Sequence, residues 1–469
     1  MAENILFLTG KLAEPSLRKV LKEMEPVPFK YRIHQLGVSV AALMTDKMIA
    51  RRLTANDIAD SEQIIVPGRC RGDLDRLSEQ LGVPVVRGPE EVKDLPIYFG
   101  GERKEPDLSH YDVTIFAEIV DAPERDIDSI VDRALYYGDC GANVIDLGCL
   151  PEEKFPHLEE AIIALHEAGF KVSVDSLELD DLRRAGKAGA DYLLSLTEKT
   201  YHLANEFDSI PILVPAERGS LASLERAMEL MDKINRPWIA DPILEPIHFG
   251  LTNSIVRYHE LRQRYPDAPM MMGIGNLTEL TDADTSGINA LLFGIISELN
   301  ITNVLATEVS PHARRAIKEA DIARRMMFAA KQDASLPRDL TSELLIAHER
   351  RPFPDNAQEI TELAGNIKDP SYRIKVAEQG IYIFNRDGIM QDVDPFAFYP
   401  QLDLKDDTGH AFYLGAELAR AQIAWQLGKR YTQDQELEWG CATTTDEQDL
   451  TQQTAEGTTL TTGKNCGTA

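Results

Sequence analysis

Between residues 111 and 329 the chain repeats one pattern eight times, a short apolar run followed by an amphipathic stretch that predicts a helix. Each apolar run is continuous rather than alternating, which is typical of parallel strands covered on both faces. The expected strands are residues 113–118, 143–147, 171–175, 191–195, 210–214, 237–241, 269–273 and 302–306. Eight such units in about 220 residues predict a closed (β/α)8 TIM barrel, so the expected fold class is α/β.

Residues 1–105 show a second alternation of strands and helices. Strands are expected at residues 5–10, 30–36, 63–68 and 84–88, and helices at residues 13–24, 40–52 and 73–80. This order predicts a separate N-terminal α/β domain with a parallel sheet. Residues 101–110 are polar and are interpreted as a linker.

Residues 330–440 predict a small C-terminal α+β unit. Two apolar runs flank Asn385–Gly388, a pattern that indicates a β-hairpin, and residues 410–431 predict a helix. The tail at residues 441–469 is rich in Thr, Gln and Asp, so we expect it to be disordered.

Three aromatic residues, Phe396, Phe398 and Tyr399, follow the hairpin. Their one-face spacing favours a place in a core or an interface over a ligand cage.

Charge and cysteine usage narrow the function. The net charge of −28 argues against nucleic acid or an anionic membrane as a partner, and a small molecule is the default ligand. The five cysteines are scattered and form no CxxC pair, which argues against a disulfide framework and against a zinc site. No apolar run reaches the ~18 residues of a membrane span, and no signal-peptide pattern appears, so a cytoplasmic location is expected.

Polar side chains end several of the expected barrel strands. Asp146, Asp175 and Asp241 lie in or at the end of the second, third and sixth strands, and Asn276 follows the seventh. A carboxylate in an apolar strand is costly unless it is paired, and any single one can be a helix cap. Three at equivalent places favour a shared site at the carboxyl ends of the strands.

Such a site suits either a metal or a ligand rich in hydrogen-bond donors. A metal site usually includes His, but only His248 and His312 lie near strand ends, and His312 is expected inside the eighth helix. We therefore favour a fused heterocycle whose amidine edge donates two parallel N–H groups to a carboxylate, and assign no metal ligand. Glu118, Asp121, His248 and Glu308 are further candidate pocket residues.

The N-terminal domain contains one candidate phosphate site. Residues 68–73 form a Gly-bounded loop that opens onto a helix and carries Arg69 and Arg71. Backbone N–H groups and guanidinium forks in such a loop can hold a phosphate. The alternative is a solvated turn in which Asp73 caps the helix.

Four ordered segments carry a family resemblance: Gly141–Gly148, Val172–Ser176, Ala240–Leu244 and Gly273–Asn276. Together they resemble the pterin-binding barrel family, which contains dihydropteroate synthases and methyltetrahydrofolate–corrinoid methyltransferases. With the extra N-terminal domain, the layout is similar to the dihydropteroate synthase-related proteins.

The resemblance implies a reduced pterin as substrate or ligand, with no covalently bound cofactor and with Mg²⁺ accompanying a diphosphate. It implies that Asp146, Asp175 and Asp241 line the pterin pocket, with Asp241 on the amino-pyrimidine edge and Asn276 at a ring nitrogen or carbonyl. It also implies a homodimer formed through the last barrel helices. Glu118 and Asp121 loosely resemble the first-strand motif of the methyltransferases.

The chain also departs from the synthases. It has Gly275–Leu277 in place of Ser-Arg-Lys, Thr307–Val309 in place of Arg-x-His, and Val120–Pro123 in place of an Asn-bearing motif. The missing groups bind the pyrophosphate that leaves, and without positive charge the transition state is less stabilised. Our hypothesis is that Arg69 and Arg71 fold over the barrel mouth and supply that charge.

Several functions fit these observations. The first is a dihydropteroate-synthase-like transferase in folate or methanopterin-type cofactor biosynthesis, which forms a pterin C–N bond and releases pyrophosphate. The second is a methyl-tetrahydropterin-dependent methyltransferase, which would need a separate corrinoid protein because the chain has no corrinoid-binding His motif. A non-catalytic pterin-binding protein and a metal-dependent barrel enzyme are further alternatives.

Overall fold

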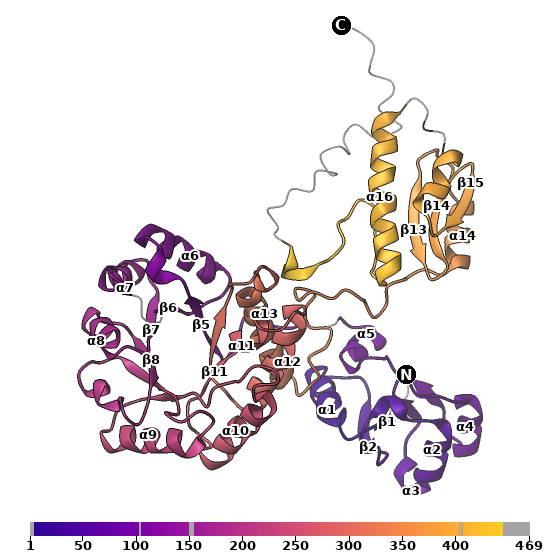
Figure 1. Ribbon diagram of the computed structural model, residues 1–469. Coiled ribbons are helices and arrows are strands. Elements are labelled where there is room, and N and C mark those ends of the chain that lie inside the picture. Colours follow the sequence, from indigo (N-terminus) through magenta and orange to yellow (C-terminus); the bar gives the residue numbers. More distant parts are fainter. Residues whose placement is uncertain (1–3, 103–104, 150–153, 403, 405–406, 444–469) are drawn as a thin grey trace. The chain divides into compact units, whose positions relative to one another are not determined.

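The computed structural model describes residues 4–102, 105–149, 154–402, 404 and 407–443 (Figure 1). Two compact units account for the chain. One comprises residues 1–280, 290–307 and 320–341, and the other comprises residues 281–289, 308–319 and 342–469. Among the described residues, no helix combines the length and the apolar character needed to cross a membrane.

The central sheet has eight parallel strands in the order β10-β9-β8-β7-β6-β5-β12-β11. They are β5 (Thr114–Ile119), β6 (Val144–Gly148), β7 (Lys171–Asp175), β8 (Tyr192–Leu196), β9 (Ile210–Leu213), β10 (Ile239–Ala240), β11 (Met271–Gly273) and β12 (Asn303–Thr307). An isolated parallel bridge between Ala240 and Met270 joins the two edge strands, β10 and β11. The predicted eight-stranded barrel is therefore confirmed, with each strand close to its expected position.

Helices cover the outside of the barrel (Figure 1). They are α6 (Ile127–Asp139), α7 (Leu158–Glu167), α8 (Leu179–Ala188), α9 (Leu221–Lys233), α10 (Leu251–Arg264), α12 (Thr285–Glu298) and α13 (Ala316–Gln332). The short helix α11 (Gly275–Thr278) directly follows β11. The prediction of an α-helix after β8 is wrong. The short connection from β8 to β9 contains a 3-10 helix instead, η4 (Tyr201–Asn205).

The eighth barrel helix also begins later than expected. Ser310 and Pro311 begin a 3-10 turn, η5 (Pro311–Ala313), so His312 lies in that turn and not in the helix. Proline fits the first turn of either kind of helix, so it could not mark the start of α13. The Glu308 carboxylate instead accepts a hydrogen bond from the backbone N–H of Ile317, at 3.1 Å, in the first turn of α13.

The N-terminal sheet is parallel, as predicted, with the strand order β2-β1-β3-β4. Its strands are β1 (Asn4–Thr9), β2 (Lys30–Gln35), β3 (Gln63–Val66) and β4 (Val85–Arg87). Its helices are α1 (Glu14–Glu23), η1 (Ala41–Leu43), α2 (Asp46–Arg52), α3 (Ala55–Ile58), α4 (Leu74–Leu81), η2 (Val92–Asp94) and α5 (Leu95–Tyr98). The expected helix over residues 40–52 is divided at Thr45, whose extended backbone and hydroxyl cap α2.

The C-terminal residues form an antiparallel sheet of β13 (Arg373–Ala377), β14 (Gly380–Asn385) and β15 (Gly388–Asp392). The predicted hairpin is confirmed, and β13 adds a strand that we did not expect. The helices are α14 (Ala357–Gly365), α15 (Pro395–Phe398), η6 (Tyr399–Gln401), α16 (Thr408–Leu427) and η7 (Gly440–Ala442).

Two expectations for this region need adjustment. Helix α16 ends before residue 431, because Gly428 takes a left-handed conformation with a φ of 66°. Phe398 lies in the core, whereas Phe396 is 84% exposed and Tyr399 is 68% exposed. The expected disordered tail lies outside the described residues after residue 443.

Candidate binding site at the carboxyl ends of the barrel strands

Alternation along the strands places one layer of polar residues at the mouth of the barrel. An apolar interior layer packs below it and includes Phe116, Val144, Leu194, Ile212, Ile239 and Met271. Because side chains two residues apart share a face, the next inward layer follows directly. The polar layer at the mouth includes Glu118, Asp146, Asp241, Gly273 and Thr307 at these next positions, and Gly148 and Asp175 one step further along β6 and β7; none of these is basic.

Asp146 is fully buried in β6. Its Oδ1 accepts a hydrogen bond from the hydroxyl of Ser173, the residue that faces it across β7. Its Oδ2 is buried and has no hydrogen-bond partner in the described part of the chain. Burial, together with the charges of Asp175 and Glu118, raises the pKa of the Asp146 carboxyl well above its usual range. An orphaned buried acceptor is rare and indicates a missing donor.

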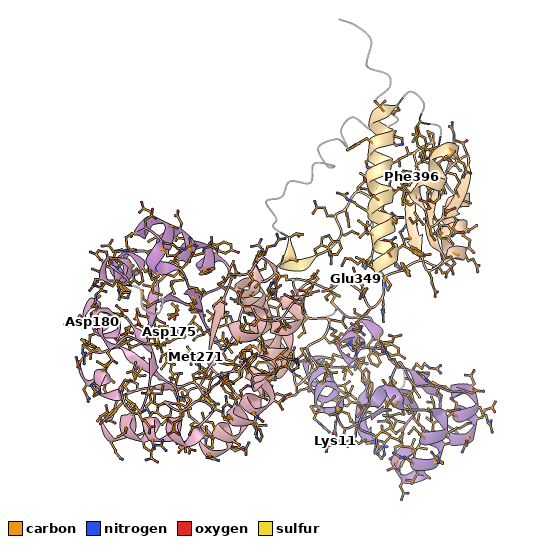
Figure 2. All side chains as sticks on the ribbon, viewed as in Figure 1. Lys11, Asp175, Asp180, Met271, Glu349 and Phe396 are labelled. Carbon is orange, nitrogen blue, oxygen red and sulfur yellow. The ribbon has the colours of Figure 1, made fainter. Side chains whose placement is uncertain are left out.

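Asp175, which is labelled in Figure 2, ends β7. The Ser195 hydroxyl donates to Oδ1 of Asp175 at 2.7 Å. Ser195 has a φ of 66°, within a register irregularity between β8 and β9. A non-glycine residue in this conformation is strained, and such strain is concentrated at functional sites. Burial raises the pKa of the Asp175 carboxyl.

The pKa of the Glu118 carboxyl lies near neutrality, which suits proton transfer. Burial, and then the charges of Asp175 and Glu279, raise the pKa of Glu118 to about 7. Glu279 follows α11 and accepts a hydrogen bond from Thr307 Oγ1 at 3.3 Å. Sequence reasoning missed Glu279, because its only signal is a position shortly after the seventh strand.

Asp241 directly follows β10 and has a defined hydrogen-bond geometry. Its Oδ1 accepts from the Tyr258 hydroxyl and from the Ile243 backbone N–H, both at 2.7 Å. Burial raises the pKa of Asp241 to about 6. Tyr258 is fully buried on α10 and is a second residue that the sequence did not reveal. Since both contacts use Oδ1, the geometry fixes the direction in which Oδ2 points.

Asn276 is oriented by one contact. Its Nδ2 donates a hydrogen bond of 2.7 Å to the backbone carbonyl of Leu244. Leu244 lies shortly after Asp241 in the chain. One N–H of the amide is therefore engaged, and Oδ1 is the atom that can accept from a ligand donor.

The layer is crowded on one side and open on the other. A Cβ added to Gly148 would lie 3.0 Å from Glu118 Oε1 and 3.2 Å from the Cα of Val120. A Cβ added to Gly273 would meet no heavy atom within 4 Å. The mouth therefore has space beside β11.

Four of the predicted residues share this layer: Glu118, Asp146, Asp175 and Asp241. The other candidates are placed differently. Asp121 forms a bidentate ion pair with Arg125, at 2.7 and 2.8 Å, and this pair lowers the pKa of Asp121.

Three further predictions concern residues outside this layer. Glu308 contacts the start of α13, as described above, and His248 is exposed with a φ of 66°. In the N-terminal domain, Arg69 pairs with Glu90 at 3.3 Å. Ligand roles for these residues, and for Arg71, remain predictions.

Within the described residues, no group of three or more His, Cys, Asp or Glu side chains is arranged to hold a metal ion. The buried acceptors of the mouth suit a ligand that donates hydrogen bonds.

Comparisons with known proteins relate the chain to two groups. Residues 3–90 match the model of a family of unknown function (DUF6513). The uncharacterized protein MJ0107 of Methanocaldococcus jannaschii is 28% identical over 529 aligned positions, which cover 92% of this chain and 99% of that protein.

Among solved structures, a dihydropteroate synthase of Yersinia pestis in complex with a sulfonamide drug is 13% identical, with a TM-score of 0.39. The match covers 48% of this chain and 96% of the synthase. A truncated 3-deoxy-D-arabino-heptulosonate 7-phosphate synthase of Thermotoga maritima is 12% identical, with a TM-score of 0.37, and covers 48% of this chain and 88% of that enzyme. Identities this low do not transfer an activity.

Proposed function

We propose that the barrel mouth binds the amino-pyrimidine ring of a reduced pterin and that the chain is a pterin-dependent transferase. The observation that carries this proposal is the layer of four desolvated carboxyls, in which Asp146 Oδ2 is a buried acceptor with no partner among the described residues. A pterin ring presents N–H donors along one edge, and such donors would satisfy these acceptors.

The geometry supports a specific arrangement of the ring. Asp241 has Oδ1 engaged by Tyr258 and Ile243, so Oδ2 is the atom offered to the amidine edge. Asn276 would accept from a ring N–H through Oδ1. The open space beside Gly273 gives a flat ring room to lie across the mouth.

The reaction that we place first is of the dihydropteroate-synthase type. An arylamine nitrogen would form a bond to the methylene carbon of the pterin, and the C–O bond to the diphosphate would break, with release of pyrophosphate. Mg²⁺ would enter as part of the diphosphate substrate. The developing negative charge requires cations that the inward layer lacks, and Arg69 and Arg71 are our candidates for them.

One observation favours methyl transfer as a second candidate. Glu118 has a pKa of about 7, which is suited to donating a proton at neutral pH. Proton donation to a ring nitrogen would make a methylated reduced pterin a better methyl donor. This reaction needs no pyrophosphate site, but it needs a separate acceptor such as a corrinoid protein.

Calorimetric titration distinguishes these proposals. The full chain is titrated with reduced 6-hydroxymethylpterin, its diphosphate and a methyl-tetrahydropterin, and Asp241→Asn is compared with Asp267→Asn, a substitution at an exposed position. Loss of all binding in Asp241→Asn, with wild-type binding in Asp267→Asn, supports the pterin site. Tighter binding of the diphosphate than of the alcohol favours the synthase reaction, and a preference for the methylated pterin favours methyl transfer. If the wild type binds none of the three, the proposal is wrong.

A further inference from the structure

The N-terminal sheet has a topological switch point between β1 and β3. Helix α1, which follows β1, packs with α5 on the face that carries Ile5, Phe7 and Ile65. Helix α4, which follows β3, packs with α2 on the opposite face. The connections after two neighbouring strands therefore leave the sheet in opposite directions. In open parallel sheets, small ligands bind outside the carboxyl ends of the strands at such a point.

Backbone hydrogen bonds join each of the two loops at the switch point to the strand connection on its own side. After β1, the backbone N–H of Lys11 donates to the carbonyl of Val38 at 2.8 Å, on the β2 side. After β3, the backbone N–H of Gly68 donates to the carbonyl of Pro89 at 3.3 Å, on the β4 side. A Cβ on Gly68 would lie 2.6 Å from the backbone of Glu90, so glycine is needed for this close approach.

The loop after β3 is also built as a rigid element. Arg87 donates from Nε to the carbonyl of Cys70 at 3.0 Å and from Nη2 to the carbonyl of Gly72 at 2.8 Å. Arg71 exchanges backbone hydrogen bonds with Met44 and Asp46, at 3.1 and 2.9 Å. Because the loop carbonyls are engaged, the loop backbone is fixed before any ligand arrives.

Exposed cations gather at this point, although the chain has a net charge of −28. Lys11 and Arg71 are exposed, and neither forms a salt bridge with any described residue. Among the described residues, Arg69 pairs with the half-exposed Glu90, and such surface pairs are weak. Figure 2 labels Lys11 on the N-terminal domain.

The nearby carboxylates are engaged elsewhere. Asp46 accepts from the backbone N–H groups of Lys47 and Asp73, at 2.7 and 3.2 Å. Asp73 caps α4 by accepting from the N–H of Arg76 at 3.0 Å. The carboxylates of Asp46 and Asp73 therefore each accept hydrogen bonds from backbone N–H groups close by.

We infer that Lys11, Arg69 and Arg71 form an anion site at the switch point, which binds the phosphate or diphosphate group of a small molecule within the N-terminal domain. This site is separate from the pterin site and does not rest on it. It is also an alternative to the hypothesis that Arg69 and Arg71 serve the barrel mouth.

Inorganic pyrophosphate is the probe, titrated calorimetrically into the full chain. Arg69→Ala and Arg71→Ala are each expected to weaken its binding about tenfold or more, because each removes charge-assisted hydrogen bonds. Arg51→Ala, an exposed arginine at the end of α2, is the matched control and is expected to bind as the wild type does. Circular dichroism confirms that each variant is folded.

Three results would overturn the inference. The first is wild-type pyrophosphate binding in both arginine variants, and the second is the absence of binding in the wild type at millimolar concentrations. The third is loss of pyrophosphate binding in Asp241→Asn, which would place the anion in the barrel. Unchanged binding in Asp241→Asn, with loss in the arginine variants, supports the site at the switch point whether or not pterin binds.

Discussion

The barrel and the N-terminal domain both present the carboxyl ends of parallel strands, but with opposite charge. In the barrel, these ends carry the buried carboxyls of Glu118, Asp146 and Asp175. In the N-terminal domain, they lead into loops with the exposed cations of Lys11 and Arg71. Topology explains why polar groups gather at these ends in both domains. The side chains decide which ligand each end can bind.

The two sites also differ in their contact with water. The barrel carboxyls are desolvated, so each hydrogen bond they form is strong and each missing partner is costly. The N-terminal cations are hydrated and are screened by salt. We therefore expect the barrel to discriminate by hydrogen-bond pattern and the N-terminal site to discriminate mainly by charge.

The largest effect should come from Asp146. Asp146→Asn is expected to weaken the binding of reduced 6-hydroxymethylpterin about a hundredfold, because Asn cannot ionise and offers an N–H donor where the proposed site needs a carboxylate acceptor. Arg71→Ala should leave the same dissociation constant unchanged. Calorimetric titration of both variants checks this, and equal losses in the two would contradict the independence of the sites.

Glu118 should link stability to pH. Its pKa is raised by burial from 4.5 to about 7, so the folded protein binds this proton more tightly than the unfolded chain does. The associated stability is complete below pH 4.5 and is lost as the pH rises through about 7. Glu118→Gln removes this dependence.

Relative to the wild type, the free energy of unfolding of Glu118→Gln should therefore increase by about 2 kcal/mol between about pH 5 and about pH 8. Urea unfolding at several pH values measures it. The exposed Glu160 of α7 provides the control, since Glu160→Gln should show no such trend. If the free energy of unfolding of Glu118→Gln differs from that of the wild type by the same amount across this pH range, the Glu118 carboxyl is solvated.

Gly273 tests whether the open side of the mouth receives the ligand. Gly273→Val should weaken pterin binding about tenfold, because the added side chain takes up ligand space. Gly273→Ala should keep the stability of the wild type, since a Cβ there meets no atom within 4 Å. Gly148→Ala is the contrasting variant, which should lose stability because its Cβ would press on Glu118 and Val120. Normal pterin binding by Gly273→Val would mean that the ring does not lie beside β11.

Ionic strength should give the smallest difference between the sites. Raising NaCl from about 0.05 M to about 0.5 M should weaken pyrophosphate binding severalfold, because exposed charges are screened. Pterin binding to desolvated carboxyls should change less than about twofold. Equal salt dependence for the two ligands would remove the contrast between a buried and an exposed site.

The barrel could be predicted because its strands are continuous apolar runs, a pattern that burial on both faces imposes. The position of Asp146, Asp175 and Asp241 followed from the same pattern, since each interrupts or ends such a run. The strand β13 was missed because it is short and because its alternation of Arg373 and Lys375 with apolar residues differs from the continuous apolar runs of the barrel.

The partners of the carboxyls could not be predicted, because they depend on register between strands. Ser173 meets Asp146 only because β6 and β7 pair in one particular alignment. Tyr258 reaches Asp241 from a helix, and Glu279 approaches Glu118 from a short turn after β11. Such contacts join residues that no local pattern in the sequence connects.

The raised pKa values of Glu118 and Asp241 couple ligand binding to the release of protons. With a pKa of about 7 for Glu118 and about 6 for Asp241, the empty mouth retains some protons near neutrality. A ring that donates N–H groups requires ionised acceptors, so its arrival must expel those protons into the solvent. The heat of binding would then vary with the ionisation enthalpy of the buffer, and the slope between PIPES and Tris would count the protons released.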